Sequence, residues 1–325
     1  MKKNIAVVGC GYWGKNLIRN FYELGALHSV CDPNIEAAKL YASEYNVNQY
    51  TFEEIINHPK IEGIVLAVPA PLHASMAIKS MNAGKHVFVE KPLAMNQDEA
   101  ENMLITAKNN NVHLMVGHLL QYHPVFVAIR KIIKSGNLGK LKYIYSNRLS
   151  FGKVRAEEDV IWSFAPHDLS MILSLSDSKP ISVRTEATSI LQENISDIAK
   201  IFIDFESGLR SHVFVSWLNP IKEQKLIVIG DDAMVIFDDT KSWDEKLCIY
   251  NHKIKFTGKV TDLLKADPKY IKVEESEPLQ NECLHFLKSL SEGNTPLTDG
   301  KEGLEVLQIL NSASLSLERN KKIEI

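Results

Sequence analysis

Two short segments carry side chains that could move a proton to or from a hydroxyl group. Lys91 follows Glu90 in the sequence EKP, and His167 lies in WSFAPHDLSMI, beside Asp168. Histidine titrates nearest to neutral pH and is a common general base, and a lysine can donate a hydrogen bond to an oxygen that gains negative charge. Taken alone, His167 is explained more simply as a core residue and Lys91 as a surface residue. Their interpretation depends on the elements that position them.

A glycine-rich turn near the N-terminus supplies a second candidate site. The sequence GCGYWG has the pattern GxGxxG and lies between an apolar run at 5–8 and an amphipathic pattern at 15–25. Such glycines allow a tight turn, a close approach of the backbone to a pyrophosphate and close packing of helix on strand. This context predicts a dinucleotide site, and the alternative is a turn that binds nothing. The residues expected at the cofactor are Gly9, Gly11, Tyr12, Trp13 and Gly14.

Asp32 ends the second predicted strand and favours NAD over NADP. A carboxylate at this position accepts hydrogen bonds from the ribose hydroxyls and repels a 2′-phosphate. The next residues are Pro33 and Asn34, so no arginine follows closely to bind a 2′-phosphate.

The first 120 residues alternate between short apolar runs and helical patterns. This alternation predicts an α/β fold, a doubly wound parallel sheet of the Rossmann type with helices on both faces. We expect an NAD-binding domain over residues 1–120. Strands are expected at 5–8, 27–32, 49–51, 61–69, 86–92 and 112–118, and helices at 15–25, 35–45, 52–58, 72–84 and 96–111.

The pattern changes after residue 120. Residues 181–256 are rich in alternating strands, which predicts a large open, mostly antiparallel sheet. We therefore expect an α+β domain over residues 121–325, whose C-terminal helices could pack back on the Rossmann domain. A further β-rich run is expected at 140–151, and helices at 123–136, 165–176, 280–293 and 301–320.

Composition excludes several classes of protein. The net charge of −3 over 325 residues gives no basic field for nucleic acid. The four cysteines form no CxxC pair, so we expect no metal site, reduced thiols and a cytoplasmic location. No run approaches the roughly 18 apolar residues of a membrane span, so we expect no association with a membrane.

Together these motifs resemble the glucose–fructose oxidoreductase and inositol dehydrogenase (Gfo/Idh/MocA) family. The resemblance rests on GxGxxG, Asp32, AVPAPLHASMA at 67–77, EKP at 90–92 and a histidine near position 167. It implies an NAD(P)-dependent dehydrogenase of a sugar or polyol. It also implies that the open sheet faces the substrate and forms the interface of a homodimer or homotetramer.

The resemblance assigns roles to individual residues. Lys91 would lie near the nicotinamide and the substrate, Pro92 would often follow a cis bond, and His167 would be the acid/base. Many members have an aspartate four residues before the histidine, where this chain has Ser163. What assists His167 therefore stays open. The further residues expected near the cofactor are Pro69, His73, Glu90, Lys91 and Pro92, and for His73 the alternative is a helix cap.

A narrower resemblance, to bacterial nucleotide-sugar 3-dehydrogenases, rests on GYWGKNLIRNF, SNRLSFGKVR, WSFAPHD and NECLHF. It implies oxidation at C3 of UDP-N-acetylglucosamine or its uronic acid, in the synthesis of cell-surface polysaccharide or lipid A. Cations in RLSFGKVR could hold a diphosphate or a carboxylate, and the alternative is a solvated basic loop. The residues expected at the substrate are Lys91, His118, Tyr122, Arg148, Lys153, Arg155, Ser163 and His167.

The same motifs leave two other functions open. The chain could oxidise a free polyol such as inositol, or it could be an NAD-binding sensor without catalysis. Lys91 and His167 argue against the sensor, whereas the absence of an acid at position 163 argues mildly for it.

Overall fold

The computed structural model describes residues 2, 4–152, 154–156, 158–257 and 260–325. The chain divides into two compact units. Unit 1 comprises residues 1–122 and 276–307, and unit 2 comprises residues 123–275 and 308–325. Residues 276–307, which lie within the second expected domain, thus belong to unit 1. The long helix α9 (Gly300–Arg319) has its first eight residues in unit 1 and the rest in unit 2.

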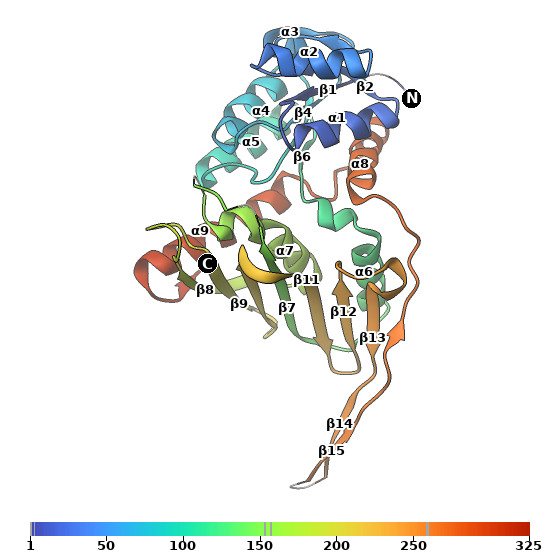
Figure 1. Ribbon diagram of the computed structural model, residues 1–325, viewed down its shortest axis with the longest axis vertical. Helices are drawn as coiled ribbons and strands as arrows, with labels where there is room; N and C mark the ends of the chain where they lie inside the picture. Colours follow the sequence, from blue (N-terminus) through green and yellow to red (C-terminus); the bar gives the residue numbers. More distant parts are fainter. Residues whose placement is uncertain (1, 3, 153, 157, 258–259) are drawn as a thin grey trace. The chain divides into compact units, whose positions relative to one another are not determined.

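Unit 1 is built on a six-stranded parallel sheet (Figure 1). Its inner strands are completely buried apolar runs such as IAVV and GIVL, as expected when both faces of a parallel sheet are covered. The predicted Rossmann-type sheet is confirmed. Its strands in spatial order are β3 (Asn48–Gln49), β2 (Leu27–Cys31), β1 (Ile5–Val8), β4 (Gly63–Leu66), β5 (His86–Val89) and β6 (Leu114–Val116).

Helices α1 and α8 pack beside each other, and so do α4 and α5. Asn96 caps α5 by accepting a hydrogen bond from the backbone of Glu99, and Thr51 forms a capping box with Glu54. The helices of unit 1 are α1 (Gly14–Glu23), α2 (Ile35–Glu44), α3 (Phe52–Asn57), α4 (His73–Asn82), α5 (Gln97–Asn109), α8 (Pro278–Glu292) and the short η1 (Ala70–Leu72) and η2 (Leu119–Tyr122).

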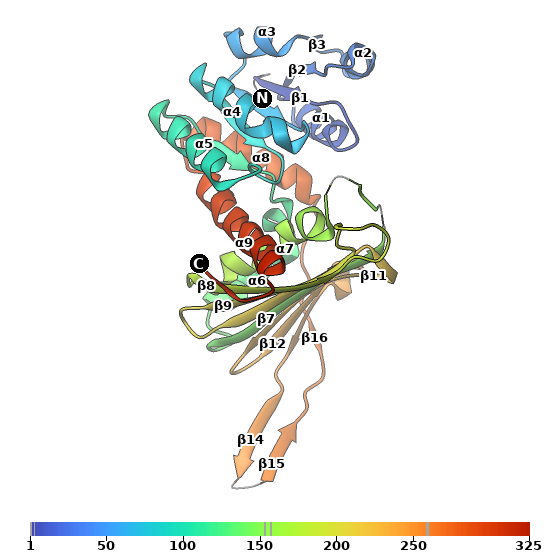
Figure 2. The ribbon, with the colours of Figure 1, turned by 90° about the vertical axis from the view of Figure 1, so that its left-hand side faces the viewer.

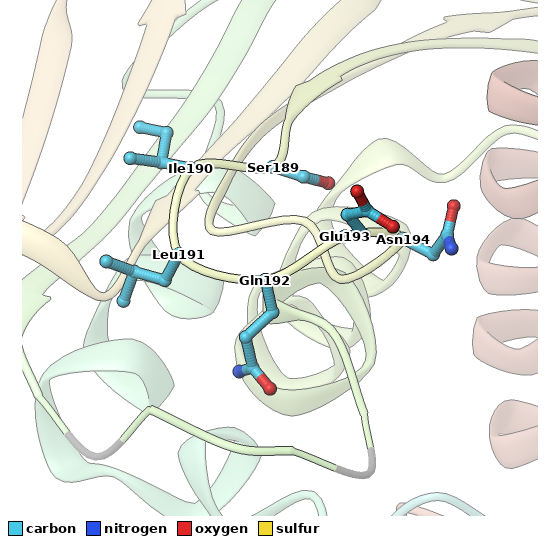
Figure 3. A pocket seen from close by; sticks show the side chains of 6 residues that line it. All are labelled: Ser189, Ile190, Leu191, Gln192, Glu193 and Asn194. Carbon is cyan, nitrogen blue, oxygen red and sulfur yellow. The ribbon is translucent and has the colours of Figure 1, made fainter.

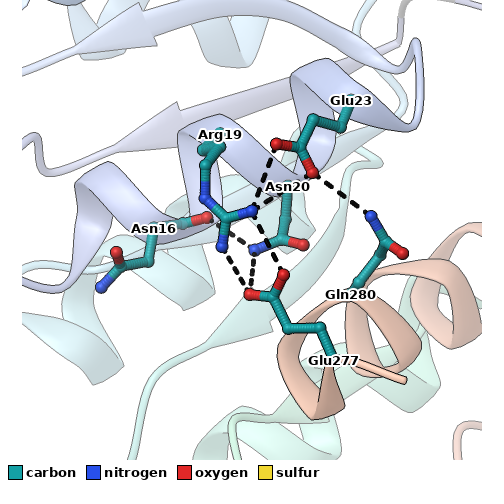
Figure 4. Close-up of polar contacts among 6 residues, drawn as sticks. All are labelled: Asn16, Arg19, Asn20, Glu23, Glu277 and Gln280. Carbon is teal, nitrogen blue, oxygen red and sulfur yellow. Dashed lines mark hydrogen bonds and ion pairs between the residues drawn. The ribbon is translucent and has the colours of Figure 1, made fainter. Parts of the chain in front are cut away.

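Helix α8 joins unit 1 because it completes the core beside the sheet. The ring of Phe286 packs edge-on against Phe21 and Phe88, and all three side chains are fully buried. Burying a phenylalanine contributes about 2–3 kcal/mol. At the start of α8, the Glu277 carboxylate accepts hydrogen bonds from the Arg19 guanidinium of α1 (Figure 4). Because both side chains are 38% exposed, this ion pair orients α8 more than it stabilises it.

Unit 2 is built on a nine-stranded sheet that is antiparallel except between β7 and β10. This agrees with the expected open, mostly antiparallel sheet. A separate hairpin joins β14 (Lys253–Thr257) and β15 (Val260–Leu264). The sheet strands in spatial order are β16 (Lys269–Tyr270), β13 (Leu247–Tyr250), β12 (Met234–Asp238), β11 (Leu218–Gly230), β7 (Leu141–Phe151), β10 (Arg210–Ser216), β9 (Ile198–Phe205), β8 (Pro180–Thr188) and β17 (Ile323–Glu324).

Helices α6 (Pro124–Lys134) and α7 (Val160–Ser176) lie on one face of this sheet (Figure 2). Helix α7 starts five residues earlier than the expected 165–176. The Asp159 carboxylate caps it by accepting hydrogen bonds from the next turn, and Val160 and Ile161 are fully buried. Cap and burial together offset the missing N–H of Pro166, which lies inside the helix.

Candidate active site

The three glycines of the N-terminal turn have different environments. A Cβ added to Gly9, whose φ is +100°, would lie 2.3 Å from the Ala67 carbonyl oxygen. A Cβ added to Gly14 would lie 1.9 Å from the Gly9 carbonyl oxygen. Packing inside unit 1 therefore requires glycine at both positions. At Gly11, by contrast, no atom of the described residues lies within 4 Å of an added Cβ. The open space over Gly11, at the start of α1, fits a bound pyrophosphate.

Asp32 follows β2, and two backbone amides hold its carboxylate in place. One oxygen accepts a hydrogen bond from the Cys10 amide at 2.7 Å, and the other accepts one from the Asn34 amide at 2.8 Å. The side chain is half-buried, and each oxygen keeps a lone pair for a ribose hydroxyl. The turn and Asp32 therefore fit the adenosine end of a dinucleotide.

The EKP segment follows β5 and is hydrogen-bonded to the glycine-rich turn. The Trp13 indole Nε1 donates a hydrogen bond to Glu90 Oε1 at 2.6 Å, and the Lys91 amide donates to Glu90 Oε2 at 3.3 Å. The Glu90 carboxyl also lies against Gly117, where an added Cβ would be 2.9 Å from Oε2. Burial raises the pKa of Glu90 to about 7. Lys91 is half-buried, and the Lys91–Pro92 bond is cis.

His73 lies under the EKP segment. Its two ring nitrogens are 2.7 Å from the Pro92 carbonyl oxygen and 2.9 Å from the Val68 carbonyl oxygen, and the side chain is buried. Burial lowers the pKa of this imidazole, so the neutral ring donates to one carbonyl at a time. His73 thus joins the segment after β4 to the segment after β5, while the expected cofactor residue Pro69 is exposed.

His118 and Tyr122 are buried in unit 1 and bind its C-terminal part. His118 Nδ1 is 2.6 Å from Glu302 Oε2, and the Tyr122 hydroxyl is 2.9 Å from Thr298 Oγ1. The Asn281 amide donates to the Tyr122 carbonyl oxygen at 3.2 Å. These contacts hold residues 276–307 in place, so both side chains, which were expected at the substrate, have a structural role in unit 1.

In unit 2, His167 is half-buried on α7. Because the helix starts at Val160, Ser163 lies one turn before His167 and shares its side of the helix. Ser163 is buried. The position at which the family resemblance leads us to expect an acid is therefore on the face of His167, and here it carries a hydroxyl.

Asp168, the residue after His167, forms an ion pair with Arg148. Its carboxylate accepts two hydrogen bonds from the Arg148 guanidinium, from Nε at 2.5 Å and from Nη2 at 3.2 Å, and one from the Ser146 hydroxyl. Asp168 is buried, and the Arg148 side chain is 15% exposed. This pair joins α7 to β7, so the charge of Arg148 and two of its five N–H donors are engaged within unit 2.

The other two cations of RLSFGKVR differ from Arg148. Arg155 is exposed and forms an ion pair with Glu158 at 2.9 Å. Lys153 lies outside the described residues. Gln192 donates to the Arg155 carbonyl oxygen, and its loop, Ser189–Asn194, borders a surface hollow of about 510 Å³ (Figure 3). The hollow is lined by that loop and contains none of the expected site residues.

The described residues hold neither a cluster of metal-ligating side chains nor a membrane-spanning helix. No three His, Cys, Asp or Glu side chains gather there into a group that could hold a metal ion. No described helix is both long and apolar enough to cross a membrane. All four cysteines are buried free thiols, and burial raises the pKa of Cys10 to about 12.

Sequence reasoning missed two carboxyl groups of the C-terminal helices, those of Glu282 and Glu302. Glu282 is fully buried, and it lies in the helix expected at 280–293, for which the sequence predicted no site residue. A usable signal was its spacing, because Leu279, Glu282, Cys283 and Phe286 follow the i, i+3, i+4, i+7 pattern of a buried helix face. Glu302 gave no such signal, since only the fold brings it to His118.

Comparison with known protein families agrees with this geometry. Residues 3–118 match a family described as the oxidoreductase family with an NAD-binding Rossmann fold, and residues 126–236 match the GFO/IDH/MocA C-terminal domain. The chain belongs to the GFO/IDH/MocA oxidoreductase family. Its first domain is of the kind that binds a nicotinamide cofactor, as the turn and Asp32 predict.

Relatives within the GFO/IDH/MocA family have several substrates. The UDP-N-acetylglucosamine 3-dehydrogenase of Acidithiobacillus ferrooxidans is 22% identical, over 96% of both chains. Its crystal structure superimposes with a TM-score of 0.86, over 97% of both chains. An inositol 2-dehydrogenase of Rhizobium meliloti is 22% identical over 92% of this chain and 91% of its own. A trans-1,2-dihydrobenzene-1,2-diol dehydrogenase of Xenopus tropicalis is 31% identical over 68% of this chain and 69% of its own.

The glycine geometry predicts that Gly11→Ala weakens cofactor binding without destabilising the protein. NADH titration should show a loss of affinity of tenfold or more, while urea unfolding should change by less than about 0.5 kcal/mol. Gly14→Ala is the contrasting variant and should lose about 2–3 kcal/mol, because its methyl group would overlap the Gly9 carbonyl. Native NADH affinity in Gly11→Ala would contradict the assignment of this space to the cofactor.

The buried ion pair predicts a large effect of Asp168→Asn. This change leaves the Arg148 guanidinium without its counter-charge and should cost about 3–5 kcal/mol in urea unfolding. Glu158→Gln is the matched control, since it removes the partner of the exposed Arg155 and should cost less than about 1 kcal/mol. Equal costs for the two variants would show that Asp168 does not hold α7 to β7.

Proposed function

We propose that this protein is an NAD-dependent dehydrogenase that oxidises a sugar hydroxyl to a ketone, at C3 of a UDP-N-acetylhexosamine. UDP-N-acetylglucosamine or its uronic acid is the intended substrate. Membership of an oxidoreductase family supports the reaction class. The relative that is a UDP-N-acetylglucosamine 3-dehydrogenase aligns over nearly the whole chain and supports the substrate class.

The observation that carries the proposal is the hydrogen bond between Trp13 and Glu90. It joins the glycine-rich turn, where a pyrophosphate would bind, to the residue before Lys91. A lysine held at this edge of a parallel sheet is suited to contact a nicotinamide and a substrate hydroxyl. A surface lysine at a strand end would need no such buried support.

NAD is proposed in preference to NADP because of the carboxylate at Asp32. Its two oxygens are already fixed by backbone amides, so the charge cannot turn away from a 2′-phosphate. The same oxygens can accept hydrogen bonds from the two hydroxyl groups of an unmodified ribose.

Each catalytic residue has one role in the proposed reaction. His167 takes the proton of the sugar hydroxyl, as the side chain that titrates nearest to neutral pH. Lys91 donates a hydrogen bond to the hydroxyl oxygen and stabilises the negative charge that develops on it. A bound oxidised nicotinamide would supply the hydride acceptor that balances the oxidation of the carbon. Ser163 is proposed as the side chain that takes the place of the usual acid beside His167.

A free polyol is the second candidate substrate, and one observation favours it. Arg148 binds Asp168, so one of the three cations proposed to hold a diphosphate is already engaged. Arg155 and Lys153 then remain as the proposed diphosphate contacts. The inositol 2-dehydrogenase relative makes this alternative worth testing directly.

We propose that the chain forms a homodimer or homotetramer through the nine-stranded sheet. The sheet carries half-buried aromatic side chains on neighbouring strands, including Tyr143 and Tyr145 of β7 and His212 of β10. An aromatic surface of this kind is typical of an interface. Sedimentation should give at least a dimer, and Tyr145→Lys should shift it toward monomer. A monomeric native protein would contradict this proposal.

The proposed roles predict the effects of two substitutions on NADH formation, followed by absorbance at 340 nm. His167→Asn and Lys91→Ala should each lower kcat about 100-fold or more with UDP-N-acetylglucosamine, and each should leave the Kd for NADH within about threefold. Loss of kcat without loss of cofactor affinity is expected because both side chains act on the sugar oxygen.

Lys79→Ala provides the matched control, since Lys79 is an exposed lysine on α4 and should keep native turnover. Near-native turnover of His167→Asn would refute its role as the base. UDP should raise the Tm of the native protein if the substrate is a nucleotide sugar. An unchanged Tm with UDP, together with turnover of inositol, would favour the polyol. Absence of turnover over a full sugar panel would refute the dehydrogenase.

A further inference from the structure

Glu282 is a carboxyl group buried without a donor. It lies in α8 on the buried side of the helix, together with Leu279, Cys283 and Phe286, and has no exposed surface. Within the described part of the chain, neither Glu282 oxygen accepts a hydrogen bond. A buried polar group normally has a partner, so this carboxyl group calls for an explanation.

Two other carboxyl groups act on Glu282 electrostatically, those of Glu90 and Glu302. Each of them has donors. Glu90 accepts from the Trp13 indole and the Lys91 amide, and Glu302 is 2.6 Å from the His118 ring. Among these three carboxyl groups, Glu282 is the one that accepts no hydrogen bond from the residues that the structure describes.

This arrangement decides which carboxyl group carries a proton. A buried carboxylate without a donor costs several kcal/mol, and two nearby negative charges add to the cost. Burial raises the pKa of Glu282 well above its ordinary range, and the charges of Glu90 and Glu302 raise it further. A proton on Glu282 removes both costs, whereas a proton on Glu90 would leave the Trp13 indole facing a neutral acid.

We propose that Glu282 is a positioning residue that holds a proton in the native protein and thereby leaves Glu90 able to ionise beside Lys91. This inference rests on the proposed function, because it concerns the lysine assigned there to the sugar oxygen. An ionised Glu90 holds the Trp13 indole more strongly and favours the charged form of Lys91. Glu282 thus acts on the reaction through Glu90, without touching the substrate.

The other titratable groups around Glu282 do not replace its proton. Burial raises the pKa of the Tyr122 hydroxyl on η2 and that of the Cys283 thiol, so both stay neutral. The groups that face the cluster from the surrounding elements are Glu90 and Lys91 after β5, His118 after β6, Tyr122 of η2, Cys283 of α8 and Glu302 of α9.

The first test follows stability against pH and needs no substrate. The unfolded chain releases the Glu282 proton above pH about 4.3, whereas the native chain keeps it, so native stability falls as pH rises. From pH 5 upward, until Glu282 ionises in the native protein, the unfolding equilibrium constant of the wild type should rise about tenfold per pH unit relative to that of Glu282→Gln. A difference that does not depend on pH would overturn the proposal.

Two further variants support this measurement. Glu101→Gln, on the exposed side of α5, is the control and should show no pH-dependent difference. Glu282→Met is a second neutral replacement of similar length, to be used if Glu282→Gln does not fold. The same slope is expected relative to either neutral variant, since both lack the proton.

A double-mutant cycle tests the coupling to Glu90. In a Glu90→Gln background one negative charge near Glu282 is gone, so Glu282 should release its proton at a lower pH. The pH range over which the unfolding equilibrium constants of the proteins with Glu282 and with Glu282→Gln diverge should then end at least one pH unit lower. An identical range in both backgrounds would show that Glu282 does not act on Glu90.

The final readout is the pH profile of kcat/KM. Glu282→Gln has no proton to lose, so its alkaline limb should move at least one pH unit higher than that of the wild type. An unmoved limb would overturn the positioning role even if the stability data show a protonated Glu282. If no sugar is oxidised by the wild type, the proposed function fails, while the unfolding data still decide whether Glu282 holds the proton.

Discussion

The hydrogen bond from the Trp13 indole to the Glu90 carboxylate is the interaction on which the candidate site depends. Trp13 follows β1 and Glu90 follows β5, and Gly117, against which the same carboxyl lies, follows β6. The carboxyl ends of three parallel strands therefore meet at one buried acid. Glycine at position 117 leaves room for that acid, and burial brings its pKa close to neutrality. The strength of the bond consequently depends on the charge of Glu90.

Most of unit 1 could be predicted from local sequence. Continuous apolar runs such as IAVV mark buried parallel strands, and GCGYWG between strand and helix marks the turn, because both depend on neighbouring residues alone. The large open sheet followed from alternating strands in the same way. The glycine-rich turn is also one of the motifs that carry the resemblance to the GFO/IDH/MocA family, which the comparisons confirm.

Features decided by distant residues could not be predicted. Pro166 argues locally for a later helix start, but Asp159 and the buried Val160 outweigh it. The ion pair between Asp168 and Arg148 forms only when α7 packs on β7. From the sequence alone, Arg148 was therefore expected to bind a ligand. The carboxyl cluster needs the C-terminal Glu302 to reach unit 1. Glu282 could have been recognised from the local sequence, because an ionisable residue rarely occupies the buried face of a helix without a partner.

The contribution of α8 to unit 1 has a consequence for the newly made chain. The rings of Phe21 and Phe88 pack against Phe286, which leaves the ribosome only after eight of the nine strands of the unit 2 sheet have been synthesised. At ordinary rates of elongation, this delay is on the order of ten to thirty seconds. During that time the first 122 residues lack a part of their core and expose aromatic surface. Until α8 has been synthesised, the nascent N-terminal segment therefore exposes the kind of apolar surface that chaperones bind.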